Sequence, residues 1–100
     1  MDVDVIPEPL RRRYVESLPG KAAALAAALE SIANGDSGGA KALRDQAHKL
    51  AGSAGMYGFD DIGHLAREIV HGVDDGTGDN AALTRDLIAI LNAASSRFGV

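Results

Sequence analysis

One short stretch of this 100-residue sequence combines a histidine with neighbours that leave it uncovered. His48 is followed by Ala51, Gly52 and Gly55, which are all too small to shield an imidazole. A glycine inside a helix costs roughly 1 kcal/mol relative to alanine, so two glycines, one turn and two turns after a histidine, need an explanation. We interpret Ala51, Gly52 and Gly55 as an access and docking surface through which another molecule reaches His48.

The chemistry open to such a histidine is nucleophilic. A neutral imidazole is a competent nitrogen nucleophile, because its unperturbed pKa lies near 6.5. A phosphoryl group accepted there would bring negative charge, which Arg44 and Lys49 beside it are expected to stabilise. Phosphoryl transfer depends mainly on positioning and charge stabilisation, so a partner can supply most of the catalytic groups.

The outward position of His48 follows from the pattern around it. Apolar residues spaced four, three, four and three apart predict a helix over residues 40–57, and this stripe consists of Leu43, Ala47, Leu50, Ala54 and Tyr57. At about 100° per residue, His48 lies about 160° from Leu50 around the helix axis. The pattern therefore places the histidine on the face opposite the core.

Gly58 is expected to end the predicted helix 40–57. Similar apolar stripes predict helices over residues 60–71 and 80–97, joined by a loop over residues 72–79. Residues 7–18 are predicted as a short first helix, because Pro19 suits the start of the next helix, which ends near residue 32. Four amphipathic helices joined by short loops predict an all-α fold. We expect an antiparallel four-helix bundle with a short N-terminal capping helix, as one domain over residues 1–100.

Composition excludes several classes of protein. The chain has no cysteine, which rules out disulfides and thiolate metal sites, and its net charge of −4 argues against general nucleic-acid binding. No apolar run approaches the roughly 20 residues that span a bilayer, and the start of the sequence does not resemble a signal peptide. We expect a cytoplasmic monomer that binds neither nucleic acid nor membrane.

The stretch around His48 resembles the signature of histidine-containing phosphotransfer (HPt) domains, which reads His-x-Leu-Lys-Gly-Ser followed by small residues and a later glycine. The matching positions are His48, Leu50, Gly52, Ser53, Ala54, Gly55 and Gly58. Leu65, Glu68 and Ile69 are also similar to the helix that follows in such domains. The resemblance covers roughly residues 40–70 at the level of motifs.

The resemblance implies a phosphorelay carrier. His48 would take a phosphoryl group from an aspartate of one receiver domain and pass it to another. The implied partners are receiver domains of response regulators and hybrid histidine kinases, which carry the Mg²⁺ and the acceptor aspartate. It also implies that Gly52 leaves room around His48, and we interpret Ser53 as a residue of helix packing or local hydrogen bonding.

The sequence departs from the signature at Ala51, where the family has lysine. Lys49 or Arg44 is the expected replacement for that charge. The missing lysine also leaves open a second class of function, a helical interaction module that docks receiver or kinase domains without phosphoryl transfer. No phosphate-cradling loop of the type Gly-x-x-x-x-Gly-Lys-Ser/Thr occurs, so we expect no kinase activity of the chain's own and no cofactor.

Two further groups of polar residues are interpreted as solvated faces. His64, Glu68 and His71 share one face of the predicted helix 60–71, and the alternatives there are a metal site or a group, Arg67 included, that orients His48. Arg11, Arg12 and Arg13 form the one dense basic cluster, with a docking patch for an acidic partner as the alternative. Among the large apolar residues, Phe59 and Phe98 are predicted in the core and Met56 outside it.

Overall fold

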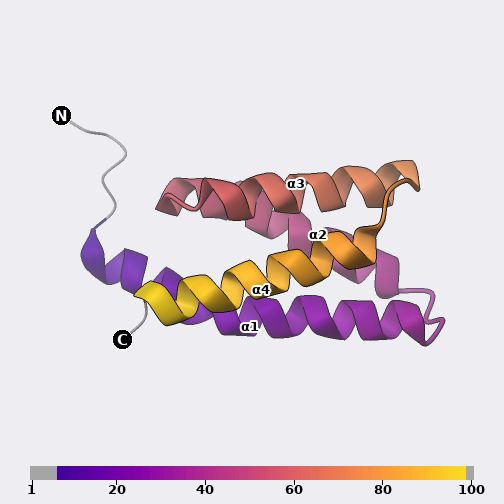
Figure 1. The fold of residues 1–100 in the computed structure, drawn as a ribbon, viewed down its shortest axis with the longest axis horizontal. Helices are drawn as coiled ribbons and strands as arrows, with labels where there is room; N and C mark the ends of the chain where they lie inside the picture. Colours follow the sequence, from indigo (N-terminus) through magenta and orange to yellow (C-terminus); the bar gives the residue numbers. More distant parts are fainter. Residues whose placement is uncertain (1–6, 99–100) are drawn as a thin grey trace.

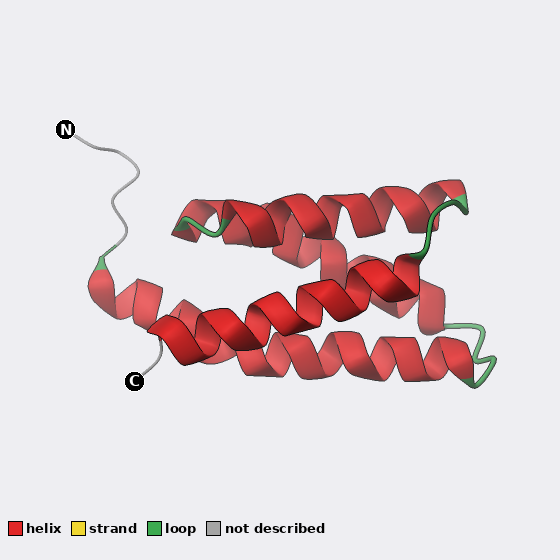
Figure 2. Ribbon diagram, viewed as in Figure 1, coloured by secondary structure: helices red, strands yellow, loops and turns green. Residues whose placement is uncertain are grey.

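The computed structural model of the protein describes residues 7–98, with the side chain of Phe98 outside the described part. It consists of four α-helices and one 3₁₀ helix (Figure 2): α1 Glu8–Ala33, α2 Gly39–Ser53, η1 Ala54–Tyr57, α3 Asp60–Asp75 and α4 Asn80–Phe98. No strand occurs within residues 7–98. The predicted all-α fold is confirmed, while the core position predicted for Phe98 falls on a side chain outside the described residues.

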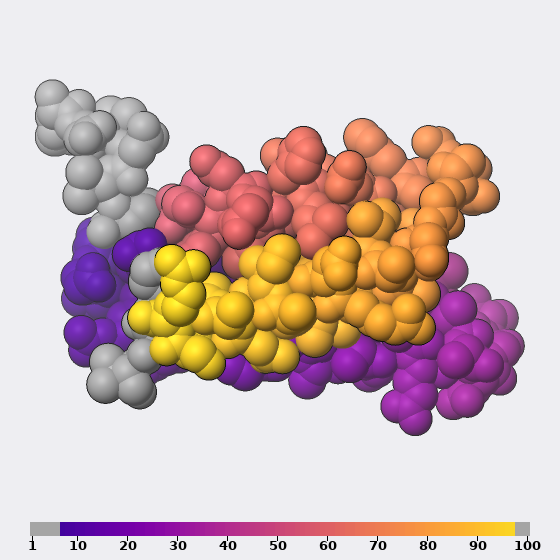
Figure 3. Space-filling view, viewed as in Figure 1, coloured from indigo at the N-terminus to yellow at the C-terminus, as the bar shows by residue number. Residues whose placement is uncertain are grey.

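The helices form a bundle in which each one packs against two others. α1 lies against α2 and α4, and α3 lies against α2 and α4. Following the colours of Figure 1, the chain runs along α1, returns along α2, runs out again along α3 and returns along α4. The space-filling view shows α3 and α4 side by side over one face of the molecule (Figure 3), and the ribbon shows most of α2 behind them (Figure 1).

The predicted stripes form one apolar core. On α2, Leu43, Ala47 and Leu50 are each at most 1% exposed. They meet buried residues from every other α-helix, among them Leu18, Leu25, Ile62, Ala66, Ile69, Leu87 and Leu91. Phe59 is also buried, as predicted, whereas Met56 is 64% exposed. Burial of these side chains at roughly 25 cal/mol per Å² of apolar surface is the main term that holds the four helices together.

The predicted N-terminal capping helix is wrong, because α1 continues through Pro19 as one helix of 26 residues. A proline inside a helix removes one backbone hydrogen bond and its ring clashes with the preceding turn. Here the residues before and after Pro19, such as Val15 and Leu25, bury the same face, while Pro19 itself is exposed. Burial on both sides therefore outweighs the local penalty, and in Figure 1 the first turns of α1 are inclined to the rest.

The predicted end of the third bundle helix is also too early. α3 continues to Asp75 and ends at Gly76, whose φ of 66° is left-handed. Gly72, predicted in a loop, is instead a buried residue of α3. A Cβ atom at Gly72 would lie 2.2 Å from Oδ1 of Asn80, so this glycine allows the start of α4 to pack against the end of α3.

None of the helices within residues 7–98 is both long enough and apolar enough to cross a membrane.

Replacing Pro19 by alanine is expected to stabilise the protein by about 1–2 kcal/mol. The change restores an N–H group to the helix, which outweighs the greater freedom of the unfolded chain. Gly20→Ala is the matched control, since it raises helix propensity by roughly 0.5–1 kcal/mol at the next residue without adding a hydrogen bond. Urea unfolding followed by circular dichroism measures both. A loss of stability in Pro19→Ala would mean that packing of α1 requires the bend.

Candidate functional site

The site is built on the solvent face of α2. His48 is exposed, whereas Ala47 and Leu50 on either side of it are at most 1% exposed. This arrangement follows from the apolar stripe, which turns one face of α2 into the core and leaves the opposite face to solvent. The predicted outward position of His48 is therefore confirmed.

His48 lies at an open depression between α2 and α3. Its lining consists of three residues from each helix: His48, Ala51 and Gly52 from α2, and Arg67, Val70 and His71 from α3. Beside the imidazole, the α2 wall of the depression does not project far into solvent, because it consists of the methyl group of Ala51 and of Gly52. A Cβ atom at Gly52 would meet no other atom within 4 Å, so the space over this residue is open to solvent.

Small residues let α3 approach the end of α2 and the following η1 closely. Gly63 is buried, and a Cβ atom there would lie 3.7 Å from the backbone nitrogen of Gly55 and 3.8 Å from Cβ of Ala54. The same atom would lie 3.9 Å from the carbonyl oxygen of Ala51. Gly55 itself is exposed at this junction. The close approach brings polar side chains of α3 within reach of the face that carries His48.

Arg44 does not line the depression but forms an ion pair across the two helices. Its Nε donates to Oδ1 of Asp74 at 2.6 Å, and its second guanidinium nitrogen donates to Oδ2 at 3.2 Å. These bonds lower the pKa of Asp74, and the nearby charges of His71 and His48 lower it further. Asp74 raises the pKa of Arg44 in turn. Both partners are partly exposed, so the pair is a modest link between α2 and α3.

Lys49 is exposed on α2 and does not line the depression with His48. Its charge helps to lower the pKa of Asp45, although the hydrogen bond from Lys41 at 2.8 Å is the larger cause. Lys49 therefore contributes positive charge to the flank of the site rather than to its floor.

Ser53 joins α2 to α1. Its hydroxyl shares a hydrogen bond of 2.9 Å with the hydroxyl of Tyr14, across 39 residues of sequence. Tyr14 stacks on Tyr57 of η1, with ring centroids 4.1 Å apart and planes inclined by 7°. Burial raises the pKa of Tyr14. These contacts hold the end of α2 and the 3₁₀ turn after it against the first helix.

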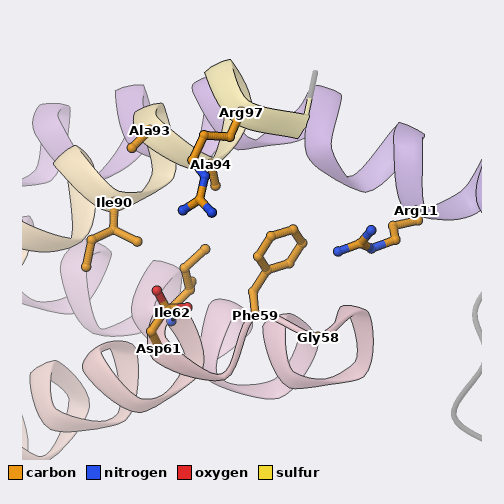
Figure 4. Close-up of a pocket in the computed structure, with 9 residues that line it drawn as sticks. All are labelled: Arg11, Gly58, Phe59, Asp61, Ile62, Ile90, Ala93, Ala94 and Arg97. Carbon is orange, nitrogen blue, oxygen red and sulfur yellow. Dashed lines mark hydrogen bonds between the residues drawn. The ribbon is translucent and has the colours of Figure 1, made fainter. Parts of the chain in front are cut away.

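A second depression lies where the ends of α1, α3 and α4 meet, and it contains none of the predicted site residues. In Figure 4, Arg11 and Arg97 extend into it from two helices and the ring of Phe59 lies between them. The guanidinium of Arg11 is 5.4 Å from the centroid of Phe59 and its Nε donates to the carbonyl of Tyr57 at 3.5 Å. Arg11 is thus not part of a solvated face, unlike the exposed Arg12 and Arg13.

Of the three polar residues predicted to share one face of α3, only one lies at the depression of His48. His64, Glu68 and His71 are all exposed, and His71 alone of the three lines the depression of His48. Within residues 7–98, no group of three or more histidine, aspartate or glutamate side chains is arranged to hold a metal ion.

A family model described as the Hpt domain matches residues 9–95, and the chain therefore belongs to the Hpt domain family. No curated protein and no solved structure matches the chain. Hpt domains are phosphotransfer modules of two-component signalling that act with receiver domains, and they are phosphocarriers rather than kinases. The resemblance read from the residues around His48 is confirmed at the level of the family.

Sequence reasoning missed the ion pair of Asp74 and left open which α3 residue lies near His48. The apolar stripe of α3 shows which face of this helix packs on the core. It does not determine how α3 is rotated against α2 or how far it is shifted along its axis. Asp74 was missed because residues 72–79 were predicted as a loop, whereas Asp74 lies in the last turn of α3. A spacing of three and four residues from Arg67 through Val70 and His71 to Asp74 was the available signal.

Arg44→Ala is expected to raise the pKa of Asp74 toward its ordinary value of 3.8, because the guanidinium is the largest cause of the lowering. Since that pKa is lowered on folding, the ion pair favours the folded state above about pH 4 and its contribution disappears as the pH falls through the lowered pKa. Carboxyl ¹³C NMR titration measures the shift. Lys41→Ala is the control: it should move the pKa of Asp45 and leave that of Asp74 in place.

Proposed function

We propose that this chain is a histidine phosphotransfer protein in which His48 carries a phosphoryl group between aspartates of receiver domains. The observation that carries the proposal is the exposed imidazole beside Ala51 and Gly52, in a chain that belongs to the Hpt domain family. The proposed domain extends over residues 1–100.

In the proposed reaction, a lone pair on an imidazole nitrogen of His48 attacks the phosphorus of an aspartyl phosphate on the partner. A P–N bond forms and the P–O bond to the aspartate breaks, so that its electron pair returns to the carboxylate. The imidazole then gives up a proton to solvent, and the reverse sequence passes the group to a second receiver. Phosphoryl transfer of this kind needs alignment of donor and acceptor, which an open approach to His48 permits.

The neighbours of His48 have distinct proposed roles. Ala51, Gly52 and Gly55 keep the approach low enough for a receiver domain to dock. Arg44 and Lys49 supply positive charge on α2 that favours a phosphorylated partner and the phosphorylated product. Ser53 keeps the end of α2 in place through its bond to Tyr14.

The test of the carrier function is transfer of label from a receiver domain phosphorylated with radioactive phosphate. We expect the parent protein to take up phosphate that is acid-labile and base-stable, as a P–N bond requires, and His48→Ala to take up none. His64→Ala is the matched control, because His64 is exposed on the neighbouring helix and does not line the depression. Equal labelling of His48→Ala and the parent would refute the assignment.

The second candidate, a module that docks receiver or kinase domains without transfer, is favoured by Ala51 at the position of the family lysine. The same experiment separates the two functions. Binding of a receiver domain by isothermal titration calorimetry, together with no label on the parent from any cognate receiver, would support the docking module.

Gly52→Gln is expected to slow transfer from the receiver by at least about tenfold, because its side chain would stand in the open approach to His48. The fold should not suffer, since a Cβ atom at Gly52 meets nothing within 4 Å. Gly20→Gln is the control, as Gly20 has equally open surroundings on α1. Both variants should gain up to about 1 kcal/mol of helix stability. Normal transfer by Gly52→Gln would mean that this position is not part of the docking surface.

A further inference from the structure

If His48 carries a phosphoryl group, as in the proposed function, a nearby cation would favour the added negative charge, and Ala51 supplies none. A lysine at residue 51 would stand on α2 at the edge of the depression, where the structure has only a methyl group. The question is which positive side chain reaches the same space. Any answer to it rests on the proposed function of His48.

The two cations of α2 are poorly placed for direct contact. Arg44 forms two hydrogen bonds with Asp74 and would have to break them to reach a phosphate. Lys49 follows His48 by one residue, so it lies about 100° around the helix from the imidazole. Neither residue lines the depression that contains His48. Their charges can act on the site only from its flanks.

Arg67 meets the conditions that Arg44 and Lys49 do not. It lines the depression from α3, opposite Ala51 and Gly52, and it is the one lysine or arginine among the lining residues. It is exposed and, among residues 7–98, its side chain forms no hydrogen bond or ion pair. A planar guanidinium with five N–H donors can bind two phosphoryl oxygens at once. The absence of a side chain beyond Cβ at residue 51 leaves room for it.

We infer that Arg67 binds the phosphoryl group on His48 and takes the part that the family lysine plays, so that the cation is supplied by α3 instead of α2. The guanidinium donates hydrogen bonds to the phosphoryl oxygens, and no bond to phosphorus changes through it. The small side chain of Ala51 thus leaves the space that the guanidinium of Arg67 enters.

The experiment measures the equilibrium constant for phosphoryl transfer from a phosphorylated receiver domain to His48, with the receiver held constant. Arg67→Ala should lower this constant about fivefold, the size expected for a partly solvated charge pair. Arg67→Lys should recover most of the loss. Ala51→Lys added to Arg67→Ala should restore the constant, because it returns the charge to the family position. Arg85→Ala on α4 removes the same charge from an exposed position outside the depression and should have no effect.

The outcomes separate the inference from the function on which it rests. Normal labelling of His48 with an unchanged equilibrium constant in Arg67→Ala would overturn the inference alone. It would also be overturned if Lys49→Ala, Arg44→Ala or His71→Ala lowered the constant while Arg67→Ala did not. Failure of the parent protein to take label at His48 would overturn both. Circular dichroism melting of Arg67→Ala checks that the bundle is intact, which the exposure of Arg67 leads us to expect.

Discussion

The site depends on the close contact of α2 and α3, which is possible because small residues face each other there. Gly63 of α3 lies against Ala51 of α2 and against Ala54 and Gly55 of η1, which directly follows α2. Larger side chains at this contact would move α3 away, and the residues of its exposed edge would no longer share a depression with His48. Interhelical distance varies with the side chains at the contact, so composition at a few positions determines which charges meet.

Because of this contact, two helices contribute residues to the site. α2 provides the proposed nucleophile, His48, and the open approach to it, and both are properties of one helical face. α3 provides Arg67 and His71 at the depression, and its Asp74, outside the lining, holds Arg44. If Arg67 takes the part inferred for it, the charge that favours phosphate on His48 can come from either helix, provided that it reaches the same space.

Periodicity was sufficient to predict the four bundle helices and the outward position of His48, because both depend on residues within one helix. It failed at Pro19 and Gly72, where local preference and tertiary packing disagree. It also predicted one helix over residues 40–57, whereas α2 ends at Ser53 and residues 54–57 form the 3₁₀ helix η1. At Pro19 continuous burial of one face outweighs a lost hydrogen bond, and at Gly72 the partner is Asn80, from the next helix. The proximity of Arg67 to His48 lay beyond the sequence, because a stripe does not determine how two helices are rotated against each other.

The stacked pair formed by Tyr14 and Tyr57 has an optical consequence. The sequence contains two tyrosines and no tryptophan, so the tyrosine fluorescence of the whole protein arises at one place, where α1 meets the turn after α2. Because the two rings stack 4.1 Å apart, a change in their separation is expected to alter the tyrosine emission. The chain thus carries its own spectroscopic probe of the junction between α1 and η1, separate from the depression that contains His48.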